Sequence, residues 1–137
     1  ELATVPGATI GSHGSTHRPL TRLDDATLVA ELAGSKAFLE DVTGRHVFAL
    51  SYPHGAVDLR VREAAARVGY KIGACSRFDI NRAGRDPLLL CRPDIHGTDS
   101  LRVFRQKLRG DWDWYRWRDA DPATAAVTTH RRIDDNR

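Results

Sequence analysis

The chain has 137 residues, of which 41% are hydrophobic and 28% are charged, and its formal net charge at pH 7 is +3. The length predicts one domain, and the composition is typical of a globular protein rather than a disordered or fibrous one. The apolar runs are too short for a membrane span. The 21 basic residues exceed the 18 acidic ones only slightly and form no basic stripe, so nucleic acid is not expected as a partner.

The sequence leaves the cellular compartment open. The chain has no methionine and starts without the basic and apolar segments of a secretion signal. We therefore expect a processed protein or the later part of a longer gene product. The two cysteines, Cys75 and Cys91, lie in apolar stretches and lack CxxC spacing. They are predicted to be buried free thiols.

Short apolar stretches alternate with longer helical patterns along most of the chain. Strands are predicted at residues 8–12, 47–51, 70–75 and 88–91. Helices are predicted from Asp24 to Gly44, from about Leu59 to Gly69, and from Thr98 or Asp99 to Gly110. This alternation indicates parallel strands covered by helices, with right-handed connections between them.

Two of the predicted helices carry an apolar stripe with a period near 3.6 residues, which is expected to face the core. In the first helix the stripe consists of Leu28, Leu32, Leu39 and Val42, widened by Val29 and Phe38. In the last helix it consists of Leu101, Phe104 and Leu108. The basic residues of the last helix are interpreted as a solvated face: Arg102, Arg105, Lys107 and Arg109.

The C-terminal end of the chain differs from the rest. Residues 111–117 contain all three tryptophans, and residues 120–137 show no apolar periodicity. The aromatic segment either packs across an edge of the fold or contacts a partner or a sugar. We therefore divide the chain into a domain at residues 1–110 and an aromatic segment with a polar tail at residues 111–137.

The first candidate site is the histidine pair His13 and His17, which directly follows a predicted strand. If this segment is a helical turn, the two imidazoles share one face and both reach one divalent metal ion. Chance spacing of two histidines is the alternative. The position favours a site, because ligands of open α/β sheets and barrels bind at the carboxyl ends of the strands.

Two more polar clusters follow predicted strands. The turn at residues 51–55 contains Pro53, His54 and Gly55 and can aim a backbone N–H into a pocket, or it can be a plain connection. Residues 92–97 contain Arg92 and His96, either as site residues or as a solvated helix-entry loop. If the strands are parallel, the three clusters converge at one edge of the sheet.

These motifs resemble those of the polysaccharide deacetylases, the NodB-homology family of carbohydrate esterases. Residues 10–21, Ile-Gly-Ser-His-Gly-Ser-Thr-His-Arg-Pro-Leu-Thr, resemble the second motif of the family. Residues 51–55, Ser-Tyr-Pro-His-Gly, resemble its third motif, and residues 92–96 and 99–110 resemble the end of its domain. The resemblance covers residues 8–110 in the family's order.

The resemblance implies a distorted (β/α) barrel and metal-dependent removal of N- or O-acetyl groups from a polysaccharide or oligosaccharide. It assigns a divalent metal, zinc or alternatively cobalt, to His13 and His17. It assigns an oxyanion-binding backbone N–H to His54, where the family usually has tyrosine, and a general acid to His96. Arg92 is the remaining candidate catalytic residue. Members of the family are commonly secreted or associated with the cell envelope.

The first motif of the family, T-F-D-D-G, is absent from this sequence. It supplies an aspartate ligand and the proposed catalytic base, and no aspartate precedes His13. We therefore expect a partial barrel that lacks its opening strands and exposes sheet edges that a second copy could cover. The alternative to an enzyme is a catalytically impaired domain that binds a saccharide or a partner. A nucleotide-binding protein is disfavoured because no Gly-rich phosphate loop is present.

Overall fold

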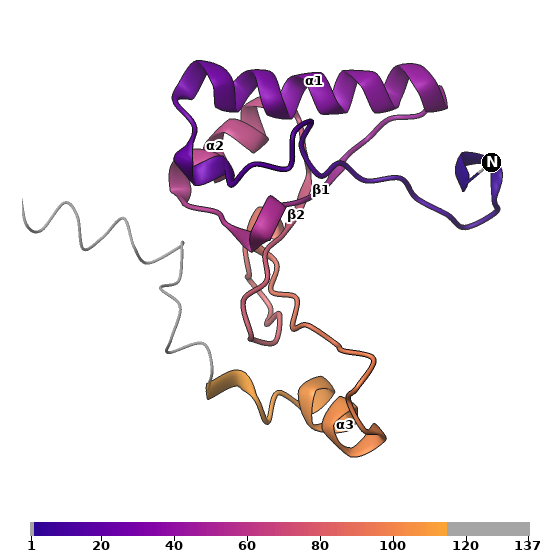
Figure 1. The fold of residues 1–137 in the computed structure, drawn as a ribbon, viewed down its shortest axis with the longest axis vertical. Coiled ribbons are helices and arrows are strands. Elements are labelled where there is room, and N and C mark those ends of the chain that lie inside the picture. Colours follow the sequence, from indigo (N-terminus) through magenta and orange to yellow (C-terminus); the bar gives the residue numbers. More distant parts are fainter. Residues whose placement is uncertain (1, 115–137) are drawn as a thin grey trace, which may run out of the picture.

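The computed structural model describes residues 2–114 (Figure 1). Its helices are α1 (Asp25–Thr43), α2 (Leu59–Val68) and α3 (Leu101–Arg109), and its strands are β1 (Ala49–Ser51) and β2 (Ile72–Ala74). Single 3-10 turns lie at Leu2–Thr4, Leu20–Arg22, Pro53–Gly55 and Pro87–Leu89. The predicted tail at residues 120–137 and residues 115–117 of the aromatic segment lie outside the described residues.

The sheet consists of parallel chain segments in sequence order. Strands β1 and β2 pair in parallel, with Leu50 opposite Gly73. Single parallel bridges extend this sheet on both sides, from Ser12 to Leu50 and from Ala74 to Leu90. The fold is therefore α/β with parallel strands, as the alternating pattern predicts.

The predictions for α1 and α2 are confirmed, because local sequence determines both ends of each helix. The Asp24 carboxylate accepts a hydrogen bond from the Thr27 backbone N–H at 2.9 Å, and Gly44 ends α1 with a φ of 64°. The Asp58 carboxylate accepts one from the Val61 N–H at 2.8 Å, and Gly69 ends α2 with a φ of 97°. Side-chain capping at the start and a left-handed glycine after the end satisfy backbone groups that a helix cannot pair internally.

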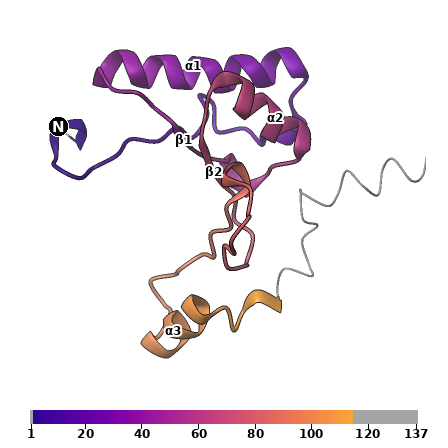
Figure 2. The same ribbon diagram turned by 180° about the vertical axis from the view of Figure 1, so that it is seen from behind.

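Helices α1 and α2 lie on the same side of the strands and pack against each other (Figures 1 and 2). Between the helices and the sheet lies the core: Leu20, Leu23, Leu28, Leu32, Val47, Leu50, Tyr52, Val61, Ala64, Ala65, Tyr70, Cys75 and Leu88. The predicted stripe of α1 is correct in part: Leu28 and Leu32 are buried and Leu39 packs against the core, whereas Val29 is 39% exposed. Phe38 and Val42, near its C-terminal end, are both 66% exposed.

Two predicted strands are wrong in extent or type. Within residues 8–12 only Ser12 pairs with the sheet, through bonds to Ala49 and Ser51 on one side. Residues 87–89 form a 3-10 turn instead of a strand, because Pro87 fixes the first φ angle and the Asp86 carboxylate accepts the Leu88 N–H at 2.9 Å. Only Leu90 then reaches the sheet.

Helix α3 lies away from the other helices, beyond the sheet (Figures 1 and 2). The Ser100 hydroxyl caps it, rather than Thr98 or Asp99. The predicted apolar face is also wrong, because Leu101 and Leu108 are 63% and 65% exposed. The buried residue of this helix is Lys107, which the sequence assigned to the solvated face.

Lys107 is buried because its ammonium group finds polar partners inside the packing of α3. It donates to the Asp99 carboxylate at 2.6 Å and to the Asp94 carbonyl at 2.8 Å. It also lies 5.9 Å from the ring centre of Phe78 and 5.8 Å from that of Trp112. These distances are within the range of cation–π contact. Polar and aromatic contacts therefore hold α3 in place of a leucine stripe.

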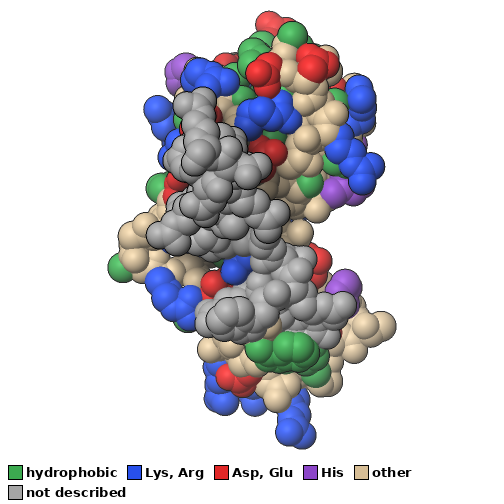
Figure 3. Space-filling model, turned by 90° about the vertical axis from the view of Figure 1, so that its left-hand side faces the viewer, with side chains coloured by type: hydrophobic (Ala, Val, Ile, Leu, Met, Phe, Trp, Pro, Cys, Tyr) green, Lys and Arg blue, Asp and Glu red, His purple; other side chains and the backbone are tan. Residues whose placement is uncertain are grey.

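No helix among the described residues is long and apolar enough to cross a membrane. On the face shown in Figure 3, lysine and arginine side chains are spread over both ends of the molecule and do not gather in one stripe. This agrees with the dispersed charge of the sequence.

Candidate functional site

The loop after Ser12 carries the first two histidines and is held against the end of β1. The His13 Nδ1 atom lies 2.6 Å from the Ser51 carbonyl oxygen. A carbonyl oxygen only accepts hydrogen bonds, so Nδ1 of His13 carries the proton and donates. The Nε2 atom is then the one with a free lone pair. In metal sites, a bond of this kind from the other ring nitrogen fixes the tautomer and ring orientation of a ligating histidine.

Glu31 of α1 fixes the backbone between the two histidines. Its carboxylate accepts the Ser15 N–H at 2.8 Å, the Thr16 N–H at 3.0 Å and the Thr16 hydroxyl at 2.7 Å. The residue is only 8% exposed. Burial alone would raise the pKa of Glu31, but the bonds from Thr16 and Ser15 and the charge of Arg18 outweigh it and lower the pKa. Glu31 is therefore a buried carboxylate that stays ionised and organises the loop.

His13, His17 and His54 lie side by side. The ring centres of His13 and His17 are 4.8 Å apart, and those of His17 and His54 are 4.6 Å apart. The segment between the first two is a loop and not the helical turn that the spacing suggested. His17 and His54 have φ angles of 58° and 57°, in the left-handed region. Two such non-glycine residues at one site indicate backbone strain held by the surrounding structure.

The turn that carries His54 is fixed from both sides. Tyr52 is fully buried, and its hydroxyl donates to the Leu88 carbonyl at 2.8 Å. Gly55 has a φ of 65°, and a Cβ there would collide with Ser76. The His54 Nε2 atom lies 3.1 Å from the His17 carbonyl oxygen and donates to it. In the part of the chain that the structure describes, the His54 backbone N–H has no hydrogen-bond partner.

A hollow of about 650 Å³ opens beside His13, between the histidine loop and α1. Its lining is Gly11, His13, Gly14, Ser15, Gly34, Ser35, Phe38 and Leu39. Small residues dominate the loop side, and the exposed Phe38 ring forms part of the helix side. Its size is within the range of small-molecule sites.

The site fits a metal ion in part. His13 offers Nε2, and no hydrogen bond from a ring nitrogen of His17 is found among residues 2–114. Imidazole is a common ligand for zinc. No group of three or more histidine, cysteine, aspartate or glutamate side chains among the described residues is arranged to hold an ion. Among the described residues, His13 and His17 are therefore two candidate ligands without a third beside them.

The third predicted cluster lies apart from these histidines. Arg92 and His96 are exposed in the loop between Leu90 and α3. Arg92 is 3.9 Å from Asp94, and the His96 backbone N–H donates to Asp99 at 3.0 Å. Within the described residues, no hydrogen bond, ion pair or ring contact joins Arg92 or His96 to the three histidines. The structure thus brings together two of the three predicted clusters.

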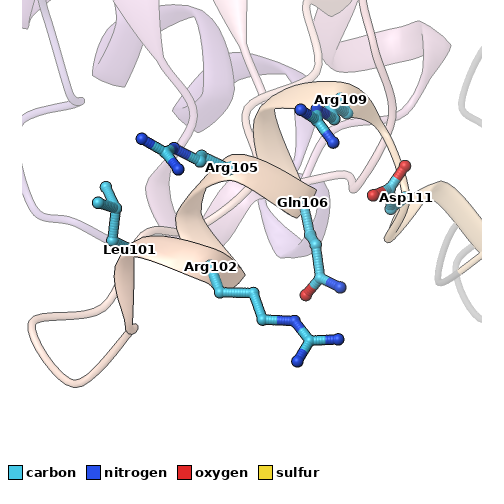
Figure 4. A pocket seen from close by; sticks show the side chains of 6 residues that line it. All are labelled: Leu101, Arg102, Arg105, Gln106, Arg109 and Asp111. Carbon is cyan, nitrogen blue, oxygen red and sulfur yellow. The ribbon is translucent and has the colours of Figure 1, made fainter.

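A second hollow, of about 430 Å³, lies on α3. Its lining is Leu101, Arg102, Arg105, Gln106, Arg109 and Asp111 (Figure 4). Arg102 and Gln106 extend in the same direction from the helix, whereas Arg105 points another way. This hollow contains none of the candidate site residues.

Residues 3–73 match the sequence profile of the polysaccharide deacetylase family. The chain belongs to the polysaccharide deacetylase family. The matched segment contains His13, His17 and the turn with His54, so the clustered histidines lie inside the part that carries the family resemblance. No protein of curated function matches the chain.

Solved structures of this family share the fold. The chain is similar to the Streptococcus pyogenes deacetylase PplD in complex with acetate, with 26% identity and a TM-score of 0.68 over 74% of this chain. It is also similar to a polysaccharide deacetylase from Bacillus cereus, with 29% identity and a TM-score of 0.65 over 74% of this chain. The chain spans 45% of the first protein and 32% of the second.

Glu31 was missed by the sequence analysis. It lies between Leu28, Leu32 and Ser35, which are all buried. A glutamate inside the apolar stripe of a helix is a signal that could have identified it, because buried carboxylates are rare unless they are hydrogen-bonded.

Proposed function

We propose that this chain is part of a metal-dependent hydrolase that removes N- or O-acetyl groups from a polysaccharide or oligosaccharide. The observation that carries the proposal is the pairing of His13 and His17, with the proton of His13 fixed by Ser51, inside the segment that matches the deacetylase family. The parallel segments of the sheet are proposed to be part of a distorted (β/α) barrel.

His13 and His17 would hold the ion, which we propose to be zinc, with cobalt as the alternative. When bound, it would supply Lewis-acid activation of water and polarisation of the acetyl carbonyl. The binding would be completed by water, a buffer anion or a carboxylate from a second chain, since two protein ligands are fewer than zinc sites use.

The turn after β1 would stabilise the negative charge that develops on the acetyl oxygen. The His54 backbone N–H has no partner among residues 2–114 and lies in a turn fixed by Tyr52 and Gly55. A preorganised donor of this kind costs no reorganisation during the reaction. Because the N–H performs this role, the side chain of residue 54 would only line the site.

His96 is proposed as the general acid that protonates the leaving amine or alkoxide, and Arg92 as a cation near the substrate. The role of His96 rests on the family resemblance, and that of Arg92 on the positive charge it brings to the same loop. In the structure both side chains lie in the exposed loop before α3.

The decisive experiment measures acetate release from chitooligosaccharide and from acetylated xylan, with zinc or cobalt added, in parallel with calorimetry of zinc binding. The expected result is turnover by the chain and loss of zinc affinity by at least tenfold in His13→Ala, which corresponds to about 1.4 kcal/mol. The matched control is His46→Ala, because the side chain of His46 is 99% exposed. Equal zinc affinity and stoichiometry in His13→Ala and in the unsubstituted chain would contradict the proposal.

A second candidate function is a binding domain without turnover. It is favoured by the finding that the described residues bring no carboxylate to the two histidines. This function would be supported over catalysis if the unsubstituted chain binds zinc and saccharide but releases no acetate above the blank.

A further inference from the structure

The two cysteines lie opposite each other at the end of the parallel sheet. Ala74 and Leu90 form a parallel bridge, and the Leu90 N–H donates to the Gly73 carbonyl at 2.8 Å. The Cys75 N–H donates to the Leu90 carbonyl at 2.9 Å. Cys75 and Cys91 each follow a bridge residue by one position, and side chains alternate along a strand, so both project to the same side.

The backbone spacing suits a disulfide. Neighbouring strands lie about 4.7–4.9 Å apart, and the Cα atoms of disulfide-bonded cysteines are usually 4.4–6.8 Å apart. Cys91 is also held from its other side, because the Asn81 amide accepts its N–H at 2.8 Å and donates to its carbonyl at 2.9 Å. If the two chains keep this spacing one residue beyond the bridge of Ala74 and Leu90, the two cysteines need little backbone movement to bond.

The thiols are unbonded and buried, with Cys75 2% and Cys91 5% exposed, as the sequence analysis predicts. In the structure the Cys75 thiol donates to the Leu90 carbonyl at 3.3 Å. The neighbouring Cys91 thiol lowers the pKa of Cys75, against the opposing effect of burial. The charge of Arg85 acts in the same direction. The thiolate is the form that attacks disulfides, so Cys75, whose pKa is lowered, is the attacking thiol once local opening releases it from the Leu90 carbonyl.

We propose that Cys75 and Cys91 are a redox-active pair that closes to an intramolecular disulfide by exchange with a small disulfide oxidant. The Cys75 thiolate attacks one sulfur of the oxidant, forming a mixed disulfide and releasing one thiolate. Cys91 then loses its proton and attacks the Cys75 sulfur, which releases the second thiolate. Two protein thiols are oxidised to one disulfide, and one oxidant disulfide is reduced to two thiols. Because both thiols are buried, the reaction proceeds through local opening of the chain around them.

The bond would close the loop of residues 76–90 beside the histidine cluster. Ser76 directly follows Cys75 and packs against Gly55, in the turn that carries His54. Tyr52 of the same turn bonds to Leu88, near the other end of this loop. Oxidation therefore stiffens the support on which the histidine turn rests, and it does not depend on the proposed activity.

The test incubates the full chain with oxidised glutathione and then digests it for peptide mass mapping, with and without dithiothreitol. The expected result is a peptide pair linked through Cys75 and Cys91, an intact mass lower by two hydrogens, and a Tm higher by about 10 °C in the oxidised form. Dithiothreitol should reverse all three changes.

The Cys75→Ser and Cys91→Ser variants serve as matched controls and should show no such Tm change. The mapping of the unsubstituted chain needs neither variant, so the test holds even if a serine at a buried position prevents folding. Two free thiols after oxidation, stable glutathione adducts on either cysteine, or disulfides between two chains would overturn the proposal.

Discussion

At the scale of single residues, Glu31 controls the loop that carries the histidine pair. Glu31→Gln removes the charge and leaves the Ser15 and Thr16 donors with a weaker acceptor. Hydrogen bonds to charged groups contribute about 1.5–3 kcal/mol. We expect the variant to be destabilised by roughly 1–2 kcal/mol at pH 7 and to bind zinc more weakly, measured by thermal unfolding and calorimetry.

The effect of Glu31 has a defined pH dependence. Its pKa is lowered in the folded protein, so its stabilising contribution is present above the unfolded value of about 4.5 and is lost as the pH falls through the lower folded value. Glu31→Gln should therefore reduce the acid sensitivity of the Tm below about pH 4.5. The control is Glu63→Gln, because Glu63 is exposed on α2. If both variants reduce the acid sensitivity of the Tm equally, the effect is due to net charge and not to the bonds between Glu31 and the loop.

A substitution of His54 distinguishes the role of its backbone N–H from that of its side chain. Its Nε2 atom is engaged with the His17 carbonyl, and the resemblance places tyrosine at this position in most family members. His54→Tyr keeps the backbone N–H, so we expect unchanged zinc affinity and equal or higher acetate release. If the His54 side chain were instead a zinc ligand, its loss would weaken zinc binding by about tenfold or more, which corresponds to about 1.4 kcal/mol. Calorimetry of the variant distinguishes the two outcomes.

At the scale of elements, α1 and α2 could be predicted from the sequence because their ends depend on neighbours within four residues. Asp24 and Asp58 begin the two helices, and Gly44 and Gly69 end them. The strands are shorter than the apolar runs, because pairing depends on residues distant in sequence. At residues 87–89, Asp86 and Pro87 form a local 3-10 turn where the apolar residues suggested a strand.

The sequence placed His13, His17 and His54 near one another, but it did not predict what supports them or that Arg92 and His96 lie apart. The histidine positions follow from motifs in the sequence. The bond from His13 to Ser51 and the bonds to Glu31 join segments 38 and 15–16 residues apart, so they appear only in the folded chain. The prediction for α3 failed for a related reason, since Lys107 is buried by partners that lie outside its own helix.

Helix α3 therefore offers a prediction about its attachment. Lys107→Ala removes the ammonium group and leaves the Asp94 carbonyl and the buried side of Asp99 without their partner. Leu108→Ser changes an apolar residue that is 65% exposed. We expect Lys107→Ala to accelerate hydrogen exchange of the α3 amides by at least about tenfold, whereas Leu108→Ser should leave it unchanged. Faster exchange of the α3 amides in Leu108→Ser than in Lys107→Ala would show that α3 is held by its leucine side chains, as the sequence predicts, and not by Lys107.

At the scale of the whole molecule, the sheet is open on the side of the histidine loop. Ser12 bonds to β1 on one side, and no chain segment among residues 2–114 pairs with its other side. Unpaired backbone groups along a sheet edge favour pairing with another chain. The neighbouring hollow includes Phe38, which is 66% exposed. An open edge and an exposed aromatic side chain thus lie together beside His13.

We propose that a second copy of the chain covers this surface, which would also bring its carboxylates near the two histidines. Light scattering at micromolar concentration is expected to give about twice the chain mass of 15.2 kDa. Phe38→Glu places a charge in the apolar contact and should shift the protein towards the monomer. Leu108→Glu is the matched control, because Leu108 is equally exposed but lies on α3, which contributes no residue to the lining of the hollow. A monomer mass for the unsubstituted chain, or equal shifts in both variants, would show that this edge does not mediate association.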